Sequence, residues 1–239
     1  MTHTPTSSAF RQNARDALVD QNLQAALQAG GSAFVTKRSA AAGGVPEFEE
    51  LRDAARDLKN HTLANLDLYL AHYEQQVTEA GGHVHWAETA EDARSIVMDL
   101  CRSVDAKIAN KGKTMISEEI GLNDHLEENG IKPFETDLGE YIIQLRGETP
   151  SHIIAPAIHV TVDQVREAFR EHHTHLDPDR NLDDPEVLMA EARAVLREKY
   201  FEAEVGITGA NMLIAETGQS VLVTNEGNGD LSQSLARVH

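Results

Sequence analysis

Apolar residues recur at helical spacing through the first third of the chain, between about residues 8 and 80. The pattern predicts one helix over residues 8–29, ended by Gly30-Gly31, because glycine commonly follows a helix C-terminus. Thr36–Gly44 is small and polar and is predicted to be a linker. Pro46 then opens a long helix to about Ala80, because proline is tolerated in a first helical turn. The first 80 residues are therefore predicted to form a helical arm.

From residue 81 onward, short apolar runs alternate with longer amphipathic ones. The short runs predict strands at residues 83–87, 107–109, 131–135 and 152–155. The longer runs predict helices at residues 90–103, 117–129, 138–145, 161–173 and 184–200. Because strands that alternate with helices form parallel sheets, residues 81–239 are predicted to be an α/β domain with a mainly parallel sheet.

The segment Glu204–Asn228 contains three apolar runs separated by polar turns rich in glycine and asparagine. The runs start at Val205, Met212 and Val221, and predict three short strands. Glycine lets a ligand approach the main chain closely, so the turns are candidate binding loops. Ordinary structural turns explain the same pattern, and the sequence does not decide between the two.

Composition narrows the possible partners. The chain has 239 residues, with 39 acidic and 21 basic side chains, and a formal net charge of -18. This balance argues against nucleic acid or an anionic membrane as the main partner. No apolar run approaches the length of a membrane-spanning helix, and the N-terminus lacks the apolar core of a signal peptide. The single cysteine, Cys101, excludes an internal disulfide framework, is expected to lie in a helix core, and fits a cytoplasmic location.

Four loops contain the candidate chemistry: residues 111–117, 135–140, 208–211 and 216–228. Several of them follow predicted strands, and ligands of open α/β sheets bind beyond the carboxyl ends of the strands. The candidate ligand-binding residues are Lys111, Lys113, Asp137, Asn211, Glu216, Glu226 and Asn228. The two lysines would supply charge for a small carboxylate or phosphate. The phosphate-loop and dinucleotide-binding signatures are both absent, so a purely structural loop cluster remains the alternative. No catalytic residue is identified.

Other polar residues have ordinary explanations. Glu118, Glu119, Asp137 and Glu140 are best explained as helix-start carboxylates. His172, His173 and His175 are predicted to lie at a solvated helix end, and no metal site is expected. His152 and His159, in PSHIIAPAIH, are held as possible site residues.

Two long blocks, KGKTMISEEIGLN…ETDLGEYIIQL…PSHIIAPAIH and ITGAN…ETG…NEGN, resemble the LUD domain of bacterial lactate-utilization proteins, in particular their iron–sulfur subunit. The resemblance implies a three-layer, Rossmann-like fold related to ribose-5-phosphate isomerase and CoA-transferases. It also implies a subunit of a multi-protein complex that oxidises lactate to pyruvate, with other lactate-utilization subunits as partners. By analogy with CoA-transferases, Glu226 is a candidate nucleophile, although loop stabilisation is the simpler role.

The same resemblance implies [4Fe-4S] clusters, which typically need four thiolates each. Because Cys101 is the only cysteine, the sequence is interpreted as the N-terminal portion of a longer protein, without the ferredoxin-like module and without a cofactor of its own. Two alternatives remain open: a standalone enzyme acting on a phosphosugar or CoA substrate, and a non-catalytic assembly module.

Overall fold

The computed structural model describes residues 7–152 and 155–239. These form two compact units. The first contains the described residues up to Leu27 together with Ala87–Gly209 and Thr224–His239. The second contains Gln28–Trp86 and Ala210–Val223. The predicted division into an arm over residues 1–80 and a domain over residues 81–239 remains a prediction.

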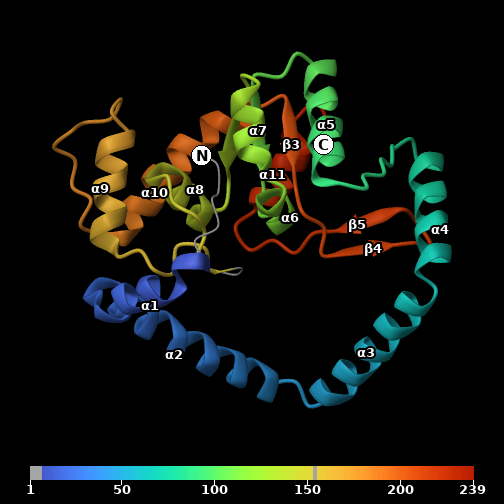
Figure 1. Ribbon diagram of the computed structural model, residues 1–239, viewed down its shortest axis with the longest axis horizontal. Coiled ribbons are helices and arrows are strands. Elements are labelled where there is room, and N and C mark those ends of the chain that lie inside the picture. The colour runs from blue at the N-terminus through green and yellow to red at the C-terminus, as the bar shows by residue number, and fades with distance from the viewer. Residues whose placement is uncertain (1–6, 153–154) are drawn as a thin grey trace. The chain divides into compact units, whose positions relative to one another are not determined.

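A parallel sheet lies at the centre of the first unit (Figure 1). Its strands are β1 (Ile108–Lys111), β2 (Lys132–Glu135) and β3 (Val205–Ile207), in the order β2-β1-β3. Both pairs of neighbouring strands are parallel. Helices connect the strands along the chain, so the fold is α/β, as the alternating pattern predicts.

One face of this sheet packs against helices α5 (Ala90–Ser103) and α7 (Leu122–Glu128). The short helix α6 (Met115–Glu119) precedes α7, and Gly121, with φ of 63°, separates the two. The single helix predicted over residues 117–129 is therefore divided, because glycine readily adopts this left-handed backbone. The buried side chains of this core are Met98, Cys101, Ala106, Ala109, Leu122, Leu126, Ile131 and Val205.

Four further helices of the unit are α8 (Leu138–Arg146), α9 (Val162–His172), α10 (Pro185–Glu202) and α11 (Asn228–Leu235). Helices α8, α9 and α10, with the segment before α10, form a second core, whose buried side chains are Tyr141, Ile142, Phe169, Leu182, Leu188, Ala192, Val195, Leu196 and Tyr200. The ammonium of Lys199 on α10 lies 5.2 Å from the ring centre of Phe134 on β2. Since Phe134 faces α10 while Ala109 belongs to the α5–α7 core, helices cover both faces of the sheet in three layers.

The N-terminal helices differ from the prediction. After a short 3₁₀ turn, η1 (Ser7–Ala9), α1 spans Phe10–Val19 and α2 spans Gln21–Gly43. The two helices are separated at Asp20. Its carboxylate accepts a hydrogen bond from the Leu23 amide at 3.0 Å and caps the second helix. The predicted helix end at Gly30-Gly31 and the linker over Thr36–Gly44 are wrong. Glycine costs a helix only about 1 kcal/mol relative to alanine, and Ala40–Ala42 favour the helical conformation.

In the second unit, α3 (Phe48–Ala64) and α4 (Leu66–Glu79) replace the single long helix predicted from Pro46. Asn65 separates them and donates from its side-chain amide to the His61 carbonyl at 2.9 Å. Because asparagine competes for backbone hydrogen bonds, it favours a break here.

The same unit contains an antiparallel hairpin of β4 (Met212–Ile214) and β5 (Gln219–Val221). Gly218 in its turn has φ of 70°, and a Cβ atom there would lie 2.6 Å from the Val77 amide of α4. The Tyr73 and Ser220 hydroxyls are 2.8 Å apart, which fixes the hairpin against α4.

One predicted strand is absent from the described residues, and another cannot be compared in full. Residues 83–87 are irregular, because they pair with no neighbouring strand. The predicted strand 152–155 includes Ile153 and Ile154, which lie outside the described residues, and its two ends are not in a strand. The remaining predicted helices and strands of the α/β region are confirmed, with ends shifted by up to about three residues.

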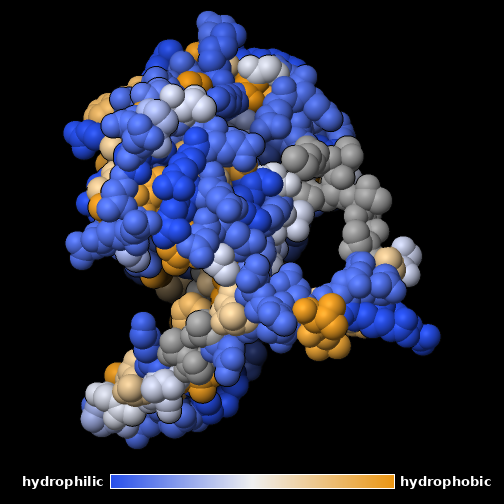
Figure 2. Space-filling view, turned by 90° about the vertical axis from the view of Figure 1, so that its left-hand side faces the viewer, coloured by the Kyte–Doolittle hydropathy of each residue, from blue (hydrophilic) through white to orange (hydrophobic). Residues whose placement is uncertain are grey.

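Hydrophilic side chains cover most of the face seen in Figure 2, with hydrophobic side chains scattered among them. This is in keeping with the formal net charge of -18. Across residues 7–152 and 155–239, no helix combines the length and apolar character that crossing a membrane requires.

Candidate functional site

The carboxyl edge of the parallel sheet brings together two charged residues that end neighbouring strands. Lys111 ends β1 and Glu135 ends β2, and the two are register partners. Register partners on adjacent strands point to the same face of the sheet. The Lys111 ammonium therefore meets the Glu135 carboxylate, with Nζ and Oε1 at 2.8 Å.

Lys111 is fully buried and has two carboxylate partners. Its Nζ also donates to Oε1 of Glu118, which lies on α6. Burial lowers the pKa of Lys111, but the charges of Glu135 and Glu118 outweigh burial and leave this pKa above its ordinary value. The lysine is therefore charged and its charge is compensated from within, which leaves little attraction for an external carboxylate or phosphate.

Glu140, in the first turn of α8, is buried beside Glu135. Burial raises the pKa of Glu135 as well, although the charge of Lys111 and the hydrogen bonds from Lys111 and Asn123 act in the opposite direction. Burial, followed by the charges of Glu135 and Asp137, raises the pKa of Glu140 to about 8. Glu140 is 4% exposed, so the cost of removing its charge from water is large. At neutral pH this side chain is mostly protonated.

Unpaired acceptors surround this carboxyl group. Asn123 donates to Oε1 of Glu135 at 2.7 Å, but the other oxygen of Glu135 has no donor among the described residues. The side-chain oxygen of Asn123 and both oxygens of Glu140 are likewise buried without a partner in that part of the chain. A proton on Glu140 supplies a donor to Glu135, which explains the surplus of acceptors. We call Lys111, Glu118, Asn123, Glu135 and Glu140 the sheet-edge cluster.

A cavity of about 500 Å³ opens on the α10–α11 side of the same sheet edge. Its polar lining includes Thr136, Tyr200, Glu226 and Asn228, and its apolar lining comes mainly from α10 and α11. Oε2 of Glu226 accepts a weak hydrogen bond from the Leu138 amide, at 3.4 Å. Burial and the charge of Asp137 raise the pKa of Glu226, although that amide and the charge of Lys113 act in the opposite direction.

The structure brings five of the seven predicted ligand-binding residues to this edge of the first unit. Asp137 caps α8 by accepting hydrogen bonds from the Gly139 and Glu140 amides, at 3.0 and 3.2 Å, which confirms its expected capping role. Asn228 begins α11 and is buried, and Lys113 lies close enough to influence Glu226. Lys111 and Glu226 complete the five.

Asn211 and Glu216 belong to the second unit instead. The side-chain oxygen of Asn211 accepts a hydrogen bond from the Val223 amide at 2.7 Å and closes the open end of the β4–β5 hairpin. Glu216 lies in the turn of the same hairpin. Their roles as ligand-binding residues remain predictions.

Helix-start roles were expected for Glu118 and Glu140, and no separate role was predicted for Glu135. The available signal was the position of Glu135 at the end of a predicted strand, one strand away from Lys111. Glu135 acquires its role because it is buried beside Lys111, and the burial of a charged residue cannot be predicted from sequence spacing alone.

The expectation for the histidine cluster is wrong at one position. His173 is 2% exposed rather than solvated. Its Nε2 lies 2.8 Å from the Tyr141 hydroxyl and its Nδ1 lies 2.7 Å from Glu191. Arg180 donates to both oxygens of Glu191, at 2.6 and 2.8 Å. This buried network joins α8, α9 and α10, because the end of α9 packs into the core rather than facing water.

The residues of this sequence do not fit an iron–sulfur cluster. Cys101 lies fully buried in the α5–α7 core, and burial raises the pKa of its thiol. A buried, protonated and single thiol cannot supply the several thiolates that such a cluster needs.

Comparisons with known proteins find a family and relatives for this chain. The LUD domain model matches residues 70–239. The chain is 41% identical over 232 residues to lactate utilization protein B of Bacillus velezensis, which covers 97% of this chain and 48% of that protein. It is 40% identical over 232 residues to lactate utilization protein B of Bacillus subtilis, with the same coverage of both proteins. No solved structure matches.

The chain therefore belongs to the LUD domain family. It spans about half the length of the curated relatives that it matches, which carry the name lactate utilization protein B.

Proposed function

We propose that this chain is the LUD-domain part of a cytoplasmic subunit in a multi-protein system that oxidises lactate to pyruvate. The observation that carries the proposal is the match of 97% of the chain, at 41% identity, to a protein named for lactate utilization. Identity at this level over nearly the whole chain favours a shared role more strongly than fold likeness alone would. The other subunits of the same system are the proposed partners.

Electron transfer is proposed to take place outside this sequence. The resemblance implies [4Fe-4S] clusters, and the relatives are about twice as long as the region that they share with this chain. Because Cys101 does not fit such a cluster, the ligands would have to come from further sequence. The α/β unit would then act as scaffold and as the site that handles protons or ligands.

The sheet-edge cluster suits proton handling. Oxidation of lactate to pyruvate releases protons as well as electrons, so the system needs a group that can exchange protons near neutral pH. A general acid or base works best when its pKa lies near the working pH, and the pKa of Glu140 is raised to about 8. The neighbouring ion pair of Lys111 with Glu135 provides a fixed charge that tunes this carboxyl group.

Growth on defined carbon sources tests the proposed role. A strain of the source organism that lacks this gene should grow on pyruvate, which is the product, and should fail to grow on L-lactate. Complementation with the intact gene should restore growth on lactate. Normal growth of the deletion strain on lactate would contradict the proposal and favour a standalone enzyme on another substrate.

A pair of variants tests the cluster separately from the overall role. Glu140→Gln keeps the size and hydrogen bonding of a protonated carboxyl group but cannot release a proton. Glu119→Gln, at an exposed position of α6, is the matched control. In extracts of the deletion strain carrying Glu140→Gln, lactate-dependent dye reduction should be about 100-fold slower than in extracts of the strain carrying the intact gene, as for loss of a general base. The level of the protein should be unchanged. Equal rates for the two variants would restrict Glu140 to a structural role.

A further inference from the structure

A serine, a histidine and a glutamate lie in hydrogen-bonding order between α8 and α9. Oγ of Ser151 lies 2.6 Å from Nδ1 of His159, and Nε2 of His159 lies 2.9 Å from Oε2 of Glu148. Arg146 donates to the other oxygen of Glu148 at 2.6 Å. This is the order of nucleophile, base and orienting carboxylate found in acyl-transfer sites.

The charge of Glu148 fixes the proton on the histidine. Burial raises the pKa of Glu148, but hydrogen bonds from Arg146 and His159 outweigh burial and hold this pKa below its ordinary value. As an ionised acceptor, Glu148 requires the N–H of His159 to lie on Nε2. The lone pair on Nδ1 then faces the Ser151 hydroxyl and can take its proton.

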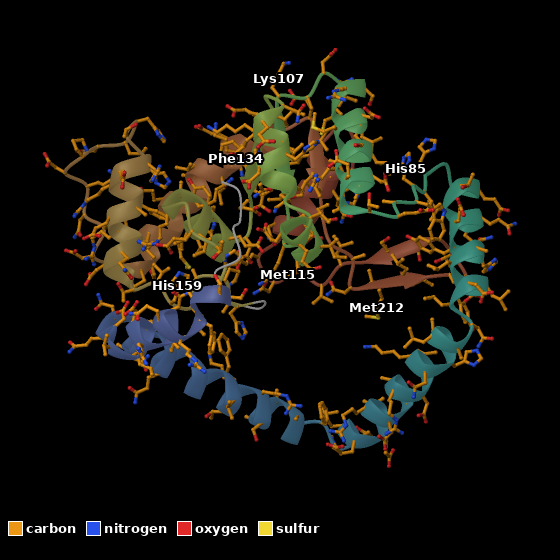
Figure 3. The ribbon with its side chains drawn as sticks, viewed as in Figure 1. His85, Lys107, Met115, Phe134, His159 and Met212 are labelled. Carbon is orange, nitrogen blue, oxygen red and sulfur yellow. The ribbon has the colours of Figure 1, made fainter. Side chains whose placement is uncertain are left out.

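The group is positioned for contact with a small molecule. Ser151 is exposed, while the His159 and Glu148 side chains are 21% and 33% exposed. All three line a cavity of about 600 Å³, together with Asn22 and Gln164. Figure 3 shows His159 in the segment before α9, near the N-terminal helices that supply Asn22.

The backbone around the serine is fixed as well. The Ser151 amide donates to the Pro156 carbonyl at 3.1 Å, and its hydroxyl has a longer contact of 3.3 Å to the same oxygen. A surface serine without such a frame would sample several rotamers. Here the short contact to His159 and the anchored backbone favour one of them.

We propose that Ser151 is an activated nucleophile that accepts acyl groups from small activated esters or thioesters. The Ser151 oxygen attacks the carbonyl carbon, and its proton moves to Nδ1 of His159. The carbon–oxygen or carbon–sulfur bond of the donor breaks, and the proton passes to the departing alkoxide or thiolate. Water then attacks the acyl-serine by the reverse proton path and releases the acid.

The cavity contains groups suited to this step. The side-chain amides of Asn22 and Gln164 line it, and amides of this kind stabilise the oxyanion of a tetrahedral intermediate in other acyl-transfer sites. None of these residues belongs to the sheet-edge cluster. The proposal is therefore independent of the role in lactate oxidation and can fail or succeed separately.

Labelling of the full chain tests the proposal. We would treat it with a fluorophosphonate probe, which joins phosphorus to the serine oxygen and releases fluoride, and separately with p-nitrophenyl acetate. Peptide mass spectrometry should locate the adduct on Ser151, and p-nitrophenolate should be released. Ser151→Ala should abolish the adduct. Ser103→Ala, at an exposed serine whose hydroxyl donates to the Leu100 carbonyl at 2.7 Å, is the matched control and should leave it unchanged.

Substitutions of the two supporting residues separate activation from mere exposure. His159→Gln should lower the labelling rate by about 100-fold, and Glu148→Gln by about 10-fold, with melting temperatures within a few degrees of the parent chain. Labelling of Ser151 that is independent of His159 would overturn the proposal. An adduct that persists in Ser151→Ala, or that lies on lysines alone, would overturn it equally.

Discussion

The two compact units of this chain differ in how they use their apolar residues. In the first unit, α10 alone buries Leu188, Ala192, Val195 and Leu196 among its core positions. In the second unit, no residue of α3 or α4 is buried, and all three residues of β4 are exposed. Leu58 and Leu63 on α3 are each 67% exposed.

The comparison shows that amphipathic spacing does not measure burial. The apolar positions of α3 and of α5 recur with the same helical period, but only those of α5 meet a sheet. Burial also underlies the chemistry of the first unit, because removal from water and close contact with other charges shift the pKa values of Lys111 and Glu140. The second unit also contains carboxylates, and those of Glu49, Asp53 and Asp57 on α3 are exposed.

The pH dependence of stability should reveal Glu140. Its pKa rises from an ordinary value of 4.5 to about 8 on folding, so the folded state binds the proton more tightly. The stability that this proton contributes is fully present below pH 4.5 and is lost as the pH rises through about 8. At 1.36 kcal/mol per pKa unit, the loss is on the order of 5 kcal/mol.

Urea unfolding of the parent chain and of Glu140→Gln across this pH range measures the effect. The difference in unfolding free energy between the two proteins should change with pH in the stated direction. Glu74→Gln, at an α4 position in the second unit, is the control and should show no such change. A difference that is flat with pH for Glu140→Gln would place its carboxyl group in water.

Truncation of a leucine should lower the free energy of unfolding much more in the first unit than in the second. Leu126, on α7, is 0% exposed, and Leu126→Ala should lower the free energy of unfolding of the first unit by about 3 kcal/mol, through lost transfer energy and a cavity. Leu58→Ala, on α3, should change stability by less than about 0.5 kcal/mol, because that side chain is already in water. Chemical denaturation followed by circular dichroism measures both, and equal losses would contradict the contrast.

Two neighbouring histidines offer a closer comparison within α9. His173→Ala should cost about 2 kcal/mol, because it leaves the buried Tyr141 hydroxyl without its His173 partner and removes one of the two donors to Oε1 of Glu191. His172→Ala, one residue earlier and exposed, should be nearly neutral. Differential scanning fluorimetry ranks the two variants, and a larger loss for His172→Ala would disprove the buried network.

Local signals predicted much of the α/β architecture. The predicted helix over residues 90–103 matches α5 at both ends. Its start is predictable because the capping box of Thr89 and Asp92 is formed by residues close together in sequence. The breaks at Asp20 and Asn65 were missed, because an ordinary polar residue ends a helix only when its side chain engages the backbone. Irregular structure at residues 83–87 was missed because a strand pattern does not reveal whether a partner strand is near.

The candidate site was predictable in position but not in chemistry. The carboxyl ends of β1 and β2 were expected to converge, and Lys111 meets Glu135 there. The compensation of Lys111 by two carboxylates, and the raised pKa of Glu140, depend on contacts between residues up to 29 positions apart in sequence. The burial of His173 depends in the same way on α10, which supplies Glu191.

Infrared spectroscopy detects the proton on Glu140 directly. At neutral pH, the spectrum of the parent chain minus that of Glu140→Gln should contain the carbonyl band of a protonated carboxylic acid. This band should disappear as the pH is raised, with a midpoint near the pKa of about 8. A difference spectrum that shows only carboxylate bands at neutral pH would mean that the sheet-edge cluster does not hold a proton, and would contradict the account.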